Sequence, residues 1–197
     1  MQLILASQSP RRKQLLTDAA LAFEIVIVPT DESYPDHLTR AEVPEFIAAD
    51  KALAVYQQLE TTRKLNEETV ILAADTIVLL QENVIGKPKD AEDAKHILRS
   101  LSGQTHEVIT GVCIMNSQKK EVFHSITKVH FNELSEEQID YYISHYQPFD
   151  KAGAYAIQEW IGLIGISGIE GDLYNVIGLP VNKVVKVLDG FLSPSKA

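Results

Sequence analysis

The chain has 197 residues, of which 45% are hydrophobic and 23% are charged, and its formal net charge is −9 at pH 7. These fractions are typical of a globular protein and exclude a disordered chain. The negative charge argues against sequence-independent nucleic-acid binding, which requires an extended basic face, and no apolar run approaches the roughly 20 residues of a membrane span.

The length and the single cysteine limit the organisation of the chain. A chain of 197 residues can form one substantial domain, or two small lobes that share a core. Cys113 has no second cysteine with which to form a disulfide, and it lies in an apolar run, so we expect a buried thiol. The apolar stretch at residues 3–6 is too short for a signal peptide, and we therefore expect a cytoplasmic protein.

The first third of the chain reads as two strands and two helices. Residues 3–6 and 23–28 are aliphatic runs that predict strands. Between them, Ser9 can cap a helix whose first position is Pro10. The polar residues 29–42 predict a loop, and the next helix is expected to begin near Pro44, because a proline deeper in a helix would clash with the preceding turn.

The remaining two thirds continue the alternation of strands and helices. Asp90 and Ser135 are predicted helix caps, the latter in a capping box with Gln138. Residues 61–68 read as a charged linker and residues 81–83 as a hairpin turn. Further strands are expected over 69–80, 106–115 and 122–131, and further helices over 91–101, 135–145 and 181–188. This order indicates an α/β domain with a mixed sheet.

The turn after the first strand concentrates groups that bind anions. It contains Ser7, Ser9, Arg11 and Arg12 at the start of a predicted helix. Free backbone N–H groups at a helix N-terminus attract phosphate, and arginine binds phosphate oxygens bidentately. The alternative is an ordinary capped helix start with solvated arginines.

Asp75 and Thr76 interrupt an otherwise apolar run of ten residues, ILAADTIVLL. A carboxylate is rarely buried unless it is paired, because an unpaired charge in an apolar strand is costly. Either the strand breaks at Asp75, or the side chain faces a cleft and binds a cation.

Several lysines lie in places that suit either ligand binding or plain solvation. Lys51 shares a polar helical sector with Asp50 and Gln57, as a solvated face would. Lys87 lies between a glycine and a proline, and Lys151 precedes a small-residue stretch that a ligand could approach closely. A Walker loop, a dinucleotide-binding glycine motif, a hydrolase elbow and zinc-type histidine spacings are all absent. The residues alone therefore indicate an α/β protein whose cleft favours phosphate and could use a metal ion.

Eight sequence blocks, in one order from residue 6 to residue 181, carry a resemblance to a known family. They are ASQSPRRKQLL, DES, ADKA, AADTIV, GKPKDAEDA, LSGQTHEVITGV, DKAGAYAIQ and EGDLYNVIGLPV. Together they resemble the Maf family of nucleoside triphosphate pyrophosphatases, which is related in fold to inosine triphosphatases. The resemblance implies one domain over residues 1–197, with an elongated mixed sheet, flanking helices and two lobes around a central cleft.

The resemblance also implies an activity, which is hydrolysis of a nucleoside triphosphate to the monophosphate and pyrophosphate as part of nucleotide-pool house-cleaning. Carried over residue by residue, it assigns catalytic roles to Asp75, Glu32, Lys51 and Lys87, with Asp75 as proton acceptor. It assigns substrate binding and specificity to Ser7, Arg11, Arg12, Thr76 and Gln158, to which we add Lys151 because a small-residue stretch follows it. Glu32 and Asp75 are the expected ligands of a divalent cation, Mg²⁺ or Mn²⁺.

The threonine after Asp75 and the block KAGAYAIQ look like the dTTP/UTP branch of the family. One departure is Glu159-Trp160, where small residues are expected. The resemblance suggests a homodimer and a nucleotide as partner. The charge and the short apolar runs described above lead us to expect neither a nucleic-acid nor a membrane partner. Two alternatives stay open: a nucleotide-binding regulator of cell division with little hydrolysis, and a purine-directed sanitiser similar to inosine triphosphatase.

Overall fold

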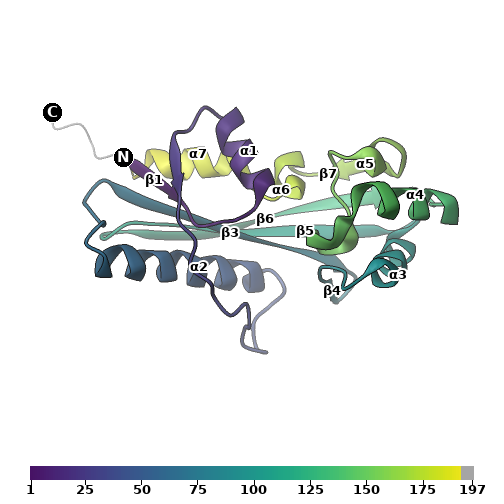
Figure 1. The fold of residues 1–197 in the computed structure, drawn as a ribbon, viewed down its shortest axis with the longest axis horizontal. Coiled ribbons are helices and arrows are strands. Elements are labelled where there is room, and N and C mark those ends of the chain that lie inside the picture. The colour runs from purple at the N-terminus through teal and green to yellow at the C-terminus, as the bar shows by residue number, and fades with distance from the viewer. Residues whose placement is uncertain (192–197) are drawn as a thin grey trace. The chain divides into compact units, whose positions relative to one another are not determined.

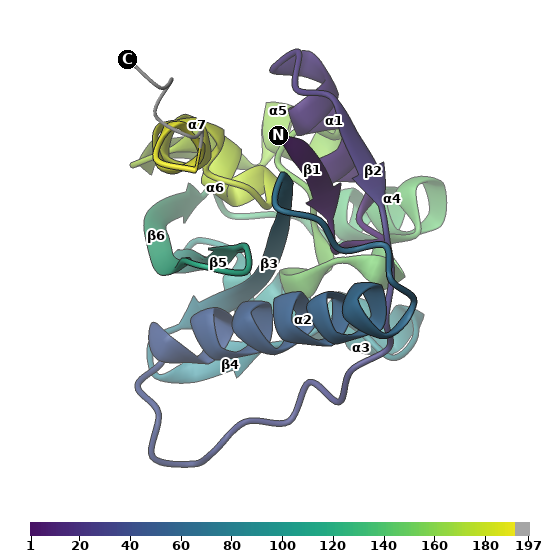
Figure 2. The ribbon, with the colours of Figure 1, turned by 90° about the vertical axis from the view of Figure 1, so that its left-hand side faces the viewer.

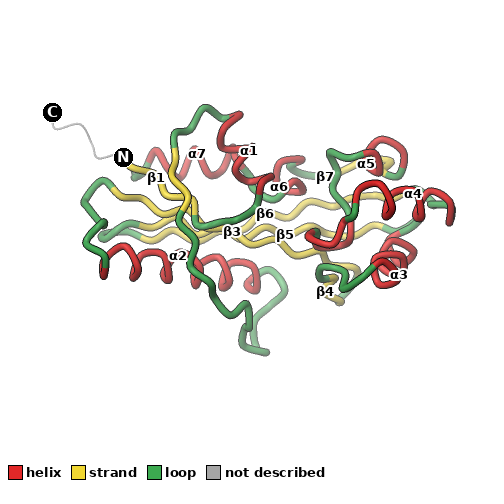
Figure 3. The backbone as a smooth tube through the Cα atoms, viewed as in Figure 1, coloured by secondary structure: helices red, strands yellow, loops and turns green. Residues whose placement is uncertain are grey.

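The computed structural model describes residues 1–191, which form strands and helices in alternation (Figures 1 and 3). The strands of this part of the chain are β1 (Gln2–Leu5), β2 (Phe23–Ile25), β3 (Thr69–Leu80), β4 (Asn83–Ile85), β5 (Thr105–Met115), β6 (Lys120–Phe131) and β7 (Ile166–Glu170). The α-helices are α1 (Pro10–Asp18), α2 (Glu42–Thr61), α3 (Ala91–Leu101), α4 (Glu136–Tyr146), α5 (Trp160–Ile164), α6 (Leu173–Ile177) and α7 (Val181–Asp189). Two short 3₁₀ turns, Pro148–Asp150 and Ala152–Ala154, lie between α4 and α5.

The strands belong to one mixed sheet in the order β2-β1-β3-β5-β6-β7, with β4 paired to β3. Strand β1 runs parallel to β2 and β3, whereas β4 is antiparallel to β3 and β7 is antiparallel to β6. The predicted mixed α/β class is thereby confirmed.

Contacts divide the chain into two compact units. Among the described residues, unit 1 comprises 1–75, 110–125 and 178–191, and unit 2 comprises 76–109 and 126–177. The division falls within β3, β5 and β6, and in β3 it falls between Asp75 and Thr76.

Helix α2 covers one face of the sheet in unit 1, while α1 and α7 cover the other face (Figures 1 and 2). Ala48, Ala52 and Val55 of α2 pack with Ile71 of β3 and Cys113 of β5 in one buried cluster. Burial raises the pKa of the Cys113 thiol to about 11, so the thiol stays protonated at neutral pH. The predicted buried and unreactive cysteine is confirmed.

The predicted start of α2 is wrong by two residues. The helix begins at Glu42, so Pro44 occupies its third position, where the N–H has no intrahelical partner and a proline costs little. The Glu42 carboxylate accepts hydrogen bonds from the Thr39 N–H and hydroxyl, both at 2.7 Å, and these bonds lower the pKa of Glu42. Residues 26–41 before this helix are a long loop (Figure 3).

Unit 2 surrounds a second core, to which α3 and α4 contribute Leu98, Ile139 and Tyr142. Both of these helices start where their caps predict. Asp90 accepts the N–H of Asp93 at 2.9 Å. At the start of α4 the predicted capping box is present, because Ser135 and Gln138 each bond the other's backbone N–H.

Strand β7 was not predicted, and β2 is shorter than the predicted 23–28. The glycine-dotted segment 152–171 shows no alternation of apolar and polar residues, which is the usual strand signal. Pairing with β6 makes residues 166–170 a strand, with Val129 opposite Ile169. Within residues 1–191, no helix is long and apolar enough to cross a membrane.

His106 of β5 is buried in the core of unit 2. Its Nε2 lies 2.7 Å from the Tyr155 hydroxyl, and its ring centroid lies 5.3 Å from that of Phe131. Burial lowers the pKa of His106 to about 4, and the charge of His130 adds to this effect. His106 is therefore neutral in the folded protein at neutral pH.

We expect the stability of the protein to fall in acid before its carboxylates titrate. The unfolded chain protonates His106 near pH 6.5 and the folded chain only near pH 4, so the free energy of unfolding should drop by ~2 kcal/mol between pH 7 and pH 4.5. Urea unfolding at stepped pH measures this slope. His106→Gln should remove most of the slope, and His96→Gln, at an exposed position of α3, should retain it.

The carboxylates act in a lower pH window. The Arg99 guanidinium lowers the pKa of Glu136 to about 2, so the stabilisation from this pair is present above pH 4.5 and is lost as the pH falls toward 2.

The prediction for His106 is contradicted if His106→Gln keeps the wild-type slope of unfolding free energy between pH 6.5 and 4.5.

Candidate functional site

The turn between β1 and α1 is built by its two serines. The Ser7 hydroxyl accepts the N–H of Ser9 at 3.2 Å, and the Ser9 hydroxyl accepts the N–H of Arg12 at 3.4 Å. Pro10 occupies the first helical position, as predicted. The hydroxyls therefore fix the backbone of the turn and cap the start of α1.

Arg12 is buried within unit 1 rather than solvated at the surface. Its Nε donates to the carbonyl oxygen of Gly178 at 2.8 Å, and its Nη1 donates to the Ser7 hydroxyl at 3.2 Å. Burial lowers the pKa of Arg12, and the neighbouring charges of Asp75 and Glu32 oppose that effect. The alternative of two solvated arginines is wrong for Arg12.

Asp75 lies within an unbroken β3, so the alternative of a strand break at this residue is wrong. Its Oδ1 lies 2.8 Å from the Nζ of Lys51, and the same ammonium lies 2.7 Å from the Oε1 of Glu32. The side chains of Asp75 and Lys51 are only 15% and 19% exposed. Lys51 is thus an internal counter-ion and not part of a solvated helix face.

Three elements supply this cluster, namely β3, α2 and the loop before α2. Lys51 projects from the middle of α2, while Glu32 comes from the loop 26–41. The charges of Asp75 and Glu32 are balanced by those of Lys51 and Arg12. This balance lowers the cost of burying the Asp75 carboxylate in an apolar strand. The structure therefore brings together Ser7, Arg12, Glu32, Lys51 and Asp75 of the predicted site.

The donor set of this cluster fits a divalent cation that is completed by a substrate. Glu32 and Asp75 offer hard carboxylate oxygens around one point, which the Lys51 ammonium occupies in this structure. Across residues 1–191 no group of three or more His, Cys, Asp or Glu side chains is arranged to hold a metal. Mg²⁺ is commonly bound by one or two carboxylates together with substrate phosphates, and this pair of carboxylates has that composition.

The other predicted residues belong to unit 2, apart from Arg11, which is half-buried on α1. Thr76 follows Asp75 in β3, and Lys87 is exposed in the turn after β4. The N–H of Gly153 donates to the carbonyl oxygen of Gly86 at 3.1 Å. This bond holds the turn that carries Lys87 against the segment 151–158.

Lys151 is the buried cation of unit 2. Its Nζ lies 3.1 Å from Asp150 Oδ1 and 3.4 Å from Glu159 Oε1, and its side chain is 8% exposed. Glu159-Trp160 departs from the family pattern, which has small residues at this position, and the sequence alone predicts no role for it. In the structure Glu159 pairs with Lys151, and the Trp160 ring packs against Tyr141 at 4.7 Å between centroids. The exposed Gln158 lies beside this pair in sequence.

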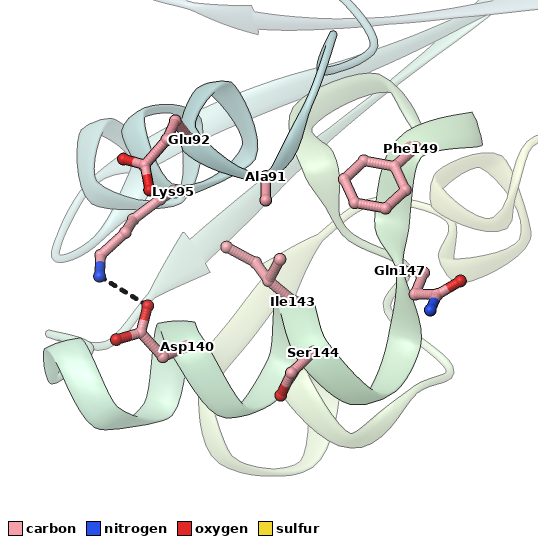
Figure 4. A pocket seen from close by; sticks show the side chains of 8 residues that line it. All are labelled: Ala91, Glu92, Lys95, Asp140, Ile143, Ser144, Gln147 and Phe149. Atoms are coloured by element: carbon pink, nitrogen blue, oxygen red, sulfur yellow. Dashed lines mark ion pairs between the residues drawn. The ribbon is translucent and has the colours of Figure 1, made fainter.

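A cavity of about 280 Å³ in unit 2 lies apart from these residues (Figure 4). It is lined by residues of α3 and α4 and of the segment after α4, among them Lys95, Asp140 and Phe149. Lys95 is neutralised by Asp140 at 2.6 Å and by Glu136 at 3.4 Å. None of the predicted site residues lines this cavity.

Comparisons with known proteins extend over nearly the whole chain. The family model described as "Maf-like protein" matches residues 2–191. A protein of Cytophaga hutchinsonii named dTTP/UTP pyrophosphatase is 49% identical over 98% of this chain and 85% of its own length. A Phocaeicola vulgatus protein of the same name is 48% identical over 93% of this chain and 92% of its own length. The Staphylococcus aureus Ham1 protein has a similar fold, with a TM-score of 0.53 and 14% identity over 96% of this chain and 99% of its own.

We expect Lys51→Met to destabilise the protein by ~1–3 kcal/mol, because it leaves the Asp75 carboxylate in an apolar strand without its nearest cation. Denaturant unfolding measures the loss. Adding Asp75→Asn to Lys51→Met should restore part of it, because the unpaired charge is then gone. Glu32→Gln serves as the control: it removes a half-exposed partner and should cost under ~1 kcal/mol. Equal effects of Lys51→Met and Glu32→Gln would contradict the pairing.

Proposed function

The chain belongs to the Maf family, and from this premise we propose that it is a nucleoside triphosphate pyrophosphatase that acts on dTTP and UTP. The reaction cleaves the bond between the α- and β-phosphates with water, giving the nucleoside monophosphate and pyrophosphate. The name dTTP/UTP pyrophosphatase, carried by relatives that are 42–49% identical to this chain, supports this choice of substrate.

One observation supports this chemistry above all others, namely the pairing of Asp75 with Lys51 beside Glu32 and Arg12. Water must attack a phosphorus atom that already carries negative oxygens. Arg12 and Lys51 can neutralise those oxygens, while the Asp75 carboxylate can take the proton of the attacking water. Lys51 holds the Asp75 carboxylate in place before the substrate binds.

The proposal includes a divalent cation held by Glu32 and Asp75. Bound there, Mg²⁺ or Mn²⁺ would neutralise charge on the phosphates and on the pyrophosphate that leaves. The support is the convergence of two carboxylates on one point, from a strand and from the loop before α2. The Lys51 ammonium lies 2.7 Å from Glu32 and 2.8 Å from Asp75, so it would turn from the carboxylates to the phosphates when the cation binds. Arg12 would bind the phosphates beside it.

The family pattern assigns the choice of base to Arg11, Thr76 and Gln158, substrate binding also to Ser7, and a catalytic role to Lys87. We add Lys151 as a binding residue because a small-residue stretch follows it. The same pattern extends the proposal to a homodimer, and we also propose a cytoplasmic location. The single, buried Cys113 is compatible with a reducing compartment.

We expect Asp75→Asn to lose at least about 10²-fold in turnover of dTTP and UTP, because the amide keeps the shape of the side chain but can neither accept the proton nor carry the charge. Pyrophosphate release across a panel of nucleoside triphosphates measures turnover, and calorimetry measures binding, which the variant should retain.

The same panel decides between the proposed function and its alternatives. No release from any triphosphate by the wild-type protein would favour the nucleotide-binding regulator. A purine preference would favour the sanitiser. Near-normal turnover by Asp75→Asn would contradict the role of Asp75 as proton acceptor.

We expect removal of divalent cations by a chelator to abolish turnover, and Mg²⁺ or Mn²⁺ to restore it. Binding of Mn²⁺, followed by electron paramagnetic resonance in the presence of a non-hydrolysable triphosphate, gives a readout that does not depend on activity. Glu32→Gln should weaken this binding about tenfold or more, because it removes one of two charged ligands. Glu24→Gln, at an exposed position of β2, should leave it unchanged.

A further inference from the structure

The segment 151–158 of unit 2 carries two of the predicted substrate-binding residues on an unusual backbone. Gly153 has a φ of +73° and Ala154 a φ of +57°. A non-glycine residue in the left-handed region is uncommon, and such a conformation persists only when its surroundings fix it. Ala154 is fully buried, so contacts within unit 2 are available to do so.

Three side-chain or backbone groups hold this segment in unit 2. The carbonyl oxygen of Gly86 accepts the N–H of Gly153 at 3.1 Å. The imidazole of His106 bonds the Tyr155 hydroxyl at 2.7 Å. The hydroxyl of Tyr142, from α4, accepts the N–H of Ala156 at 3.1 Å. The segment is thus held at the backbone of Gly153 and Ala156 and at the side chain of Tyr155.

The Tyr142 hydroxyl also reaches the far end of the segment. It donates its proton to Oε2 of Glu159, and Oε1 of Glu159 lies 3.4 Å from the ammonium of Lys151. Tyr142 is fully buried and the Glu159 side chain is 23% exposed. One hydroxyl therefore links the backbone at Ala156 to the carboxylate that faces Lys151.

The geometry of Glu159 matters because Lys151 is almost completely buried. Its other carboxylate partner, Asp150, is 58% exposed, and solvent screens an exposed charge more strongly. Without Glu159, the Lys151 ammonium would keep only the more exposed of these two carboxylates, Asp150. Its buried position would then be less stable, and the ammonium would shift toward solvent. Without Tyr142, Glu159 would lose the bond that orients it.

Building on the proposed function, we propose that Tyr142 and Glu159 are positioning residues for nucleotide recognition. They touch no reacting atom. Tyr142 fixes the backbone at Ala156, two residues before Gln158, and orients Glu159, which holds the ammonium of Lys151. The departure Glu159-Trp160 thereby acquires a role: it supplies the carboxylate that a small residue could not supply.

The backbone part of the proposal is tested by Tyr142→Phe with Tyr146→Phe as the matched control. Tyr146 lies one turn further along α4, its ring stacks on Tyr142 at 5.1 Å, and its hydroxyl takes part in none of the bonds named above. Amide hydrogen exchange of Ala156, followed by NMR, should become at least about tenfold faster in Tyr142→Phe and stay unchanged in Tyr146→Phe.

The kinetic test uses the same two variants. Tyr142→Phe should raise KM for dTTP and UTP about 5- to 10-fold with kcat changed less than about threefold, since lost positioning of binding groups weakens ground-state and transition-state binding alike. Tyr146→Phe should match the wild type. A loss of kcat that follows a fall in melting temperature, with KM unchanged, would indicate a purely structural role and overturn the proposal.

Glu159→Gln separates the two functions of the network. The amide oxygen can still accept from Tyr142, so exchange at Ala156 should stay within about twofold of the wild type. The charge facing Lys151 is lost, so KM should still rise about fivefold. Glu136→Gln is the control, because it also removes a carboxylate 3.4 Å from a lysine of unit 2, and it should leave KM unchanged. An unchanged KM in Glu159→Gln would contradict its role toward Lys151.

The exchange measurement keeps this proposal distinct from the proposed function. If the wild-type protein hydrolyses neither dTTP nor UTP, the proposed function fails, while exchange at Ala156 still reports whether Tyr142 holds the segment. If hydrolysis is found and exchange does not respond to Tyr142→Phe, the positioning role fails and the proposed function stands.

Discussion

The ion pair between Asp75 and Lys51 is the constraint on which the arrangement of unit 1 depends. A carboxylate within the apolar strand β3 requires a cation at close range, and Lys51 from α2 supplies it at 2.8 Å. The pairing fixes how α2 lies along its face of the sheet, since Lys51 must project from the same helix whose Ala48, Ala52 and Val55 fill the core. Glu32 joins the same ammonium, which ties the long loop before α2 to the strand.

The same balance of charge explains why an acidic protein has a basic turn. Arg12 is buried at considerable cost in desolvation, and the hydroxyl of Ser7, the carbonyl of Gly178 and the nearby carboxylates offset that cost. The buried positive charge of Arg12 is thus located beside carboxylates that stabilise it. A polyanionic substrate meets a cation whose position does not depend on its arrival, which is the arrangement expected of a phosphate-binding site.

In unit 2, neutral hydrogen-bonding groups hold the segment 151–158, which carries two of the predicted substrate-binding residues. Around the left-handed residues Gly153 and Ala154, Gly86 accepts the N–H of Gly153 and Tyr142 accepts the N–H of Ala156. His106 bonds the side chain of Tyr155. His106 can serve this purpose because its burial keeps it neutral, so its bond to Tyr155 persists across the physiological pH range. Rigid support of this kind suits residues that select a ligand, because a loop fixed before binding loses less entropy on binding.

The sequence by itself determined the secondary structure wherever local signals suffice. Ser9, Asp90 and Ser135 start their helices as predicted, and the bounds of β3 follow from its apolar run. The ordered blocks determined the family, and with it the residues of the candidate site. Only the tertiary structure decided the status of the charged residues, because a polar position on a helix reads the same whether it is solvated or paired. Lys51 looked like a solvated face and is a counter-ion, Glu159 looked like an anomaly and faces Lys151, and β7 exists because β6 pairs with it. These outcomes depend on contacts between residues far apart in sequence, and no local pattern encodes such contacts.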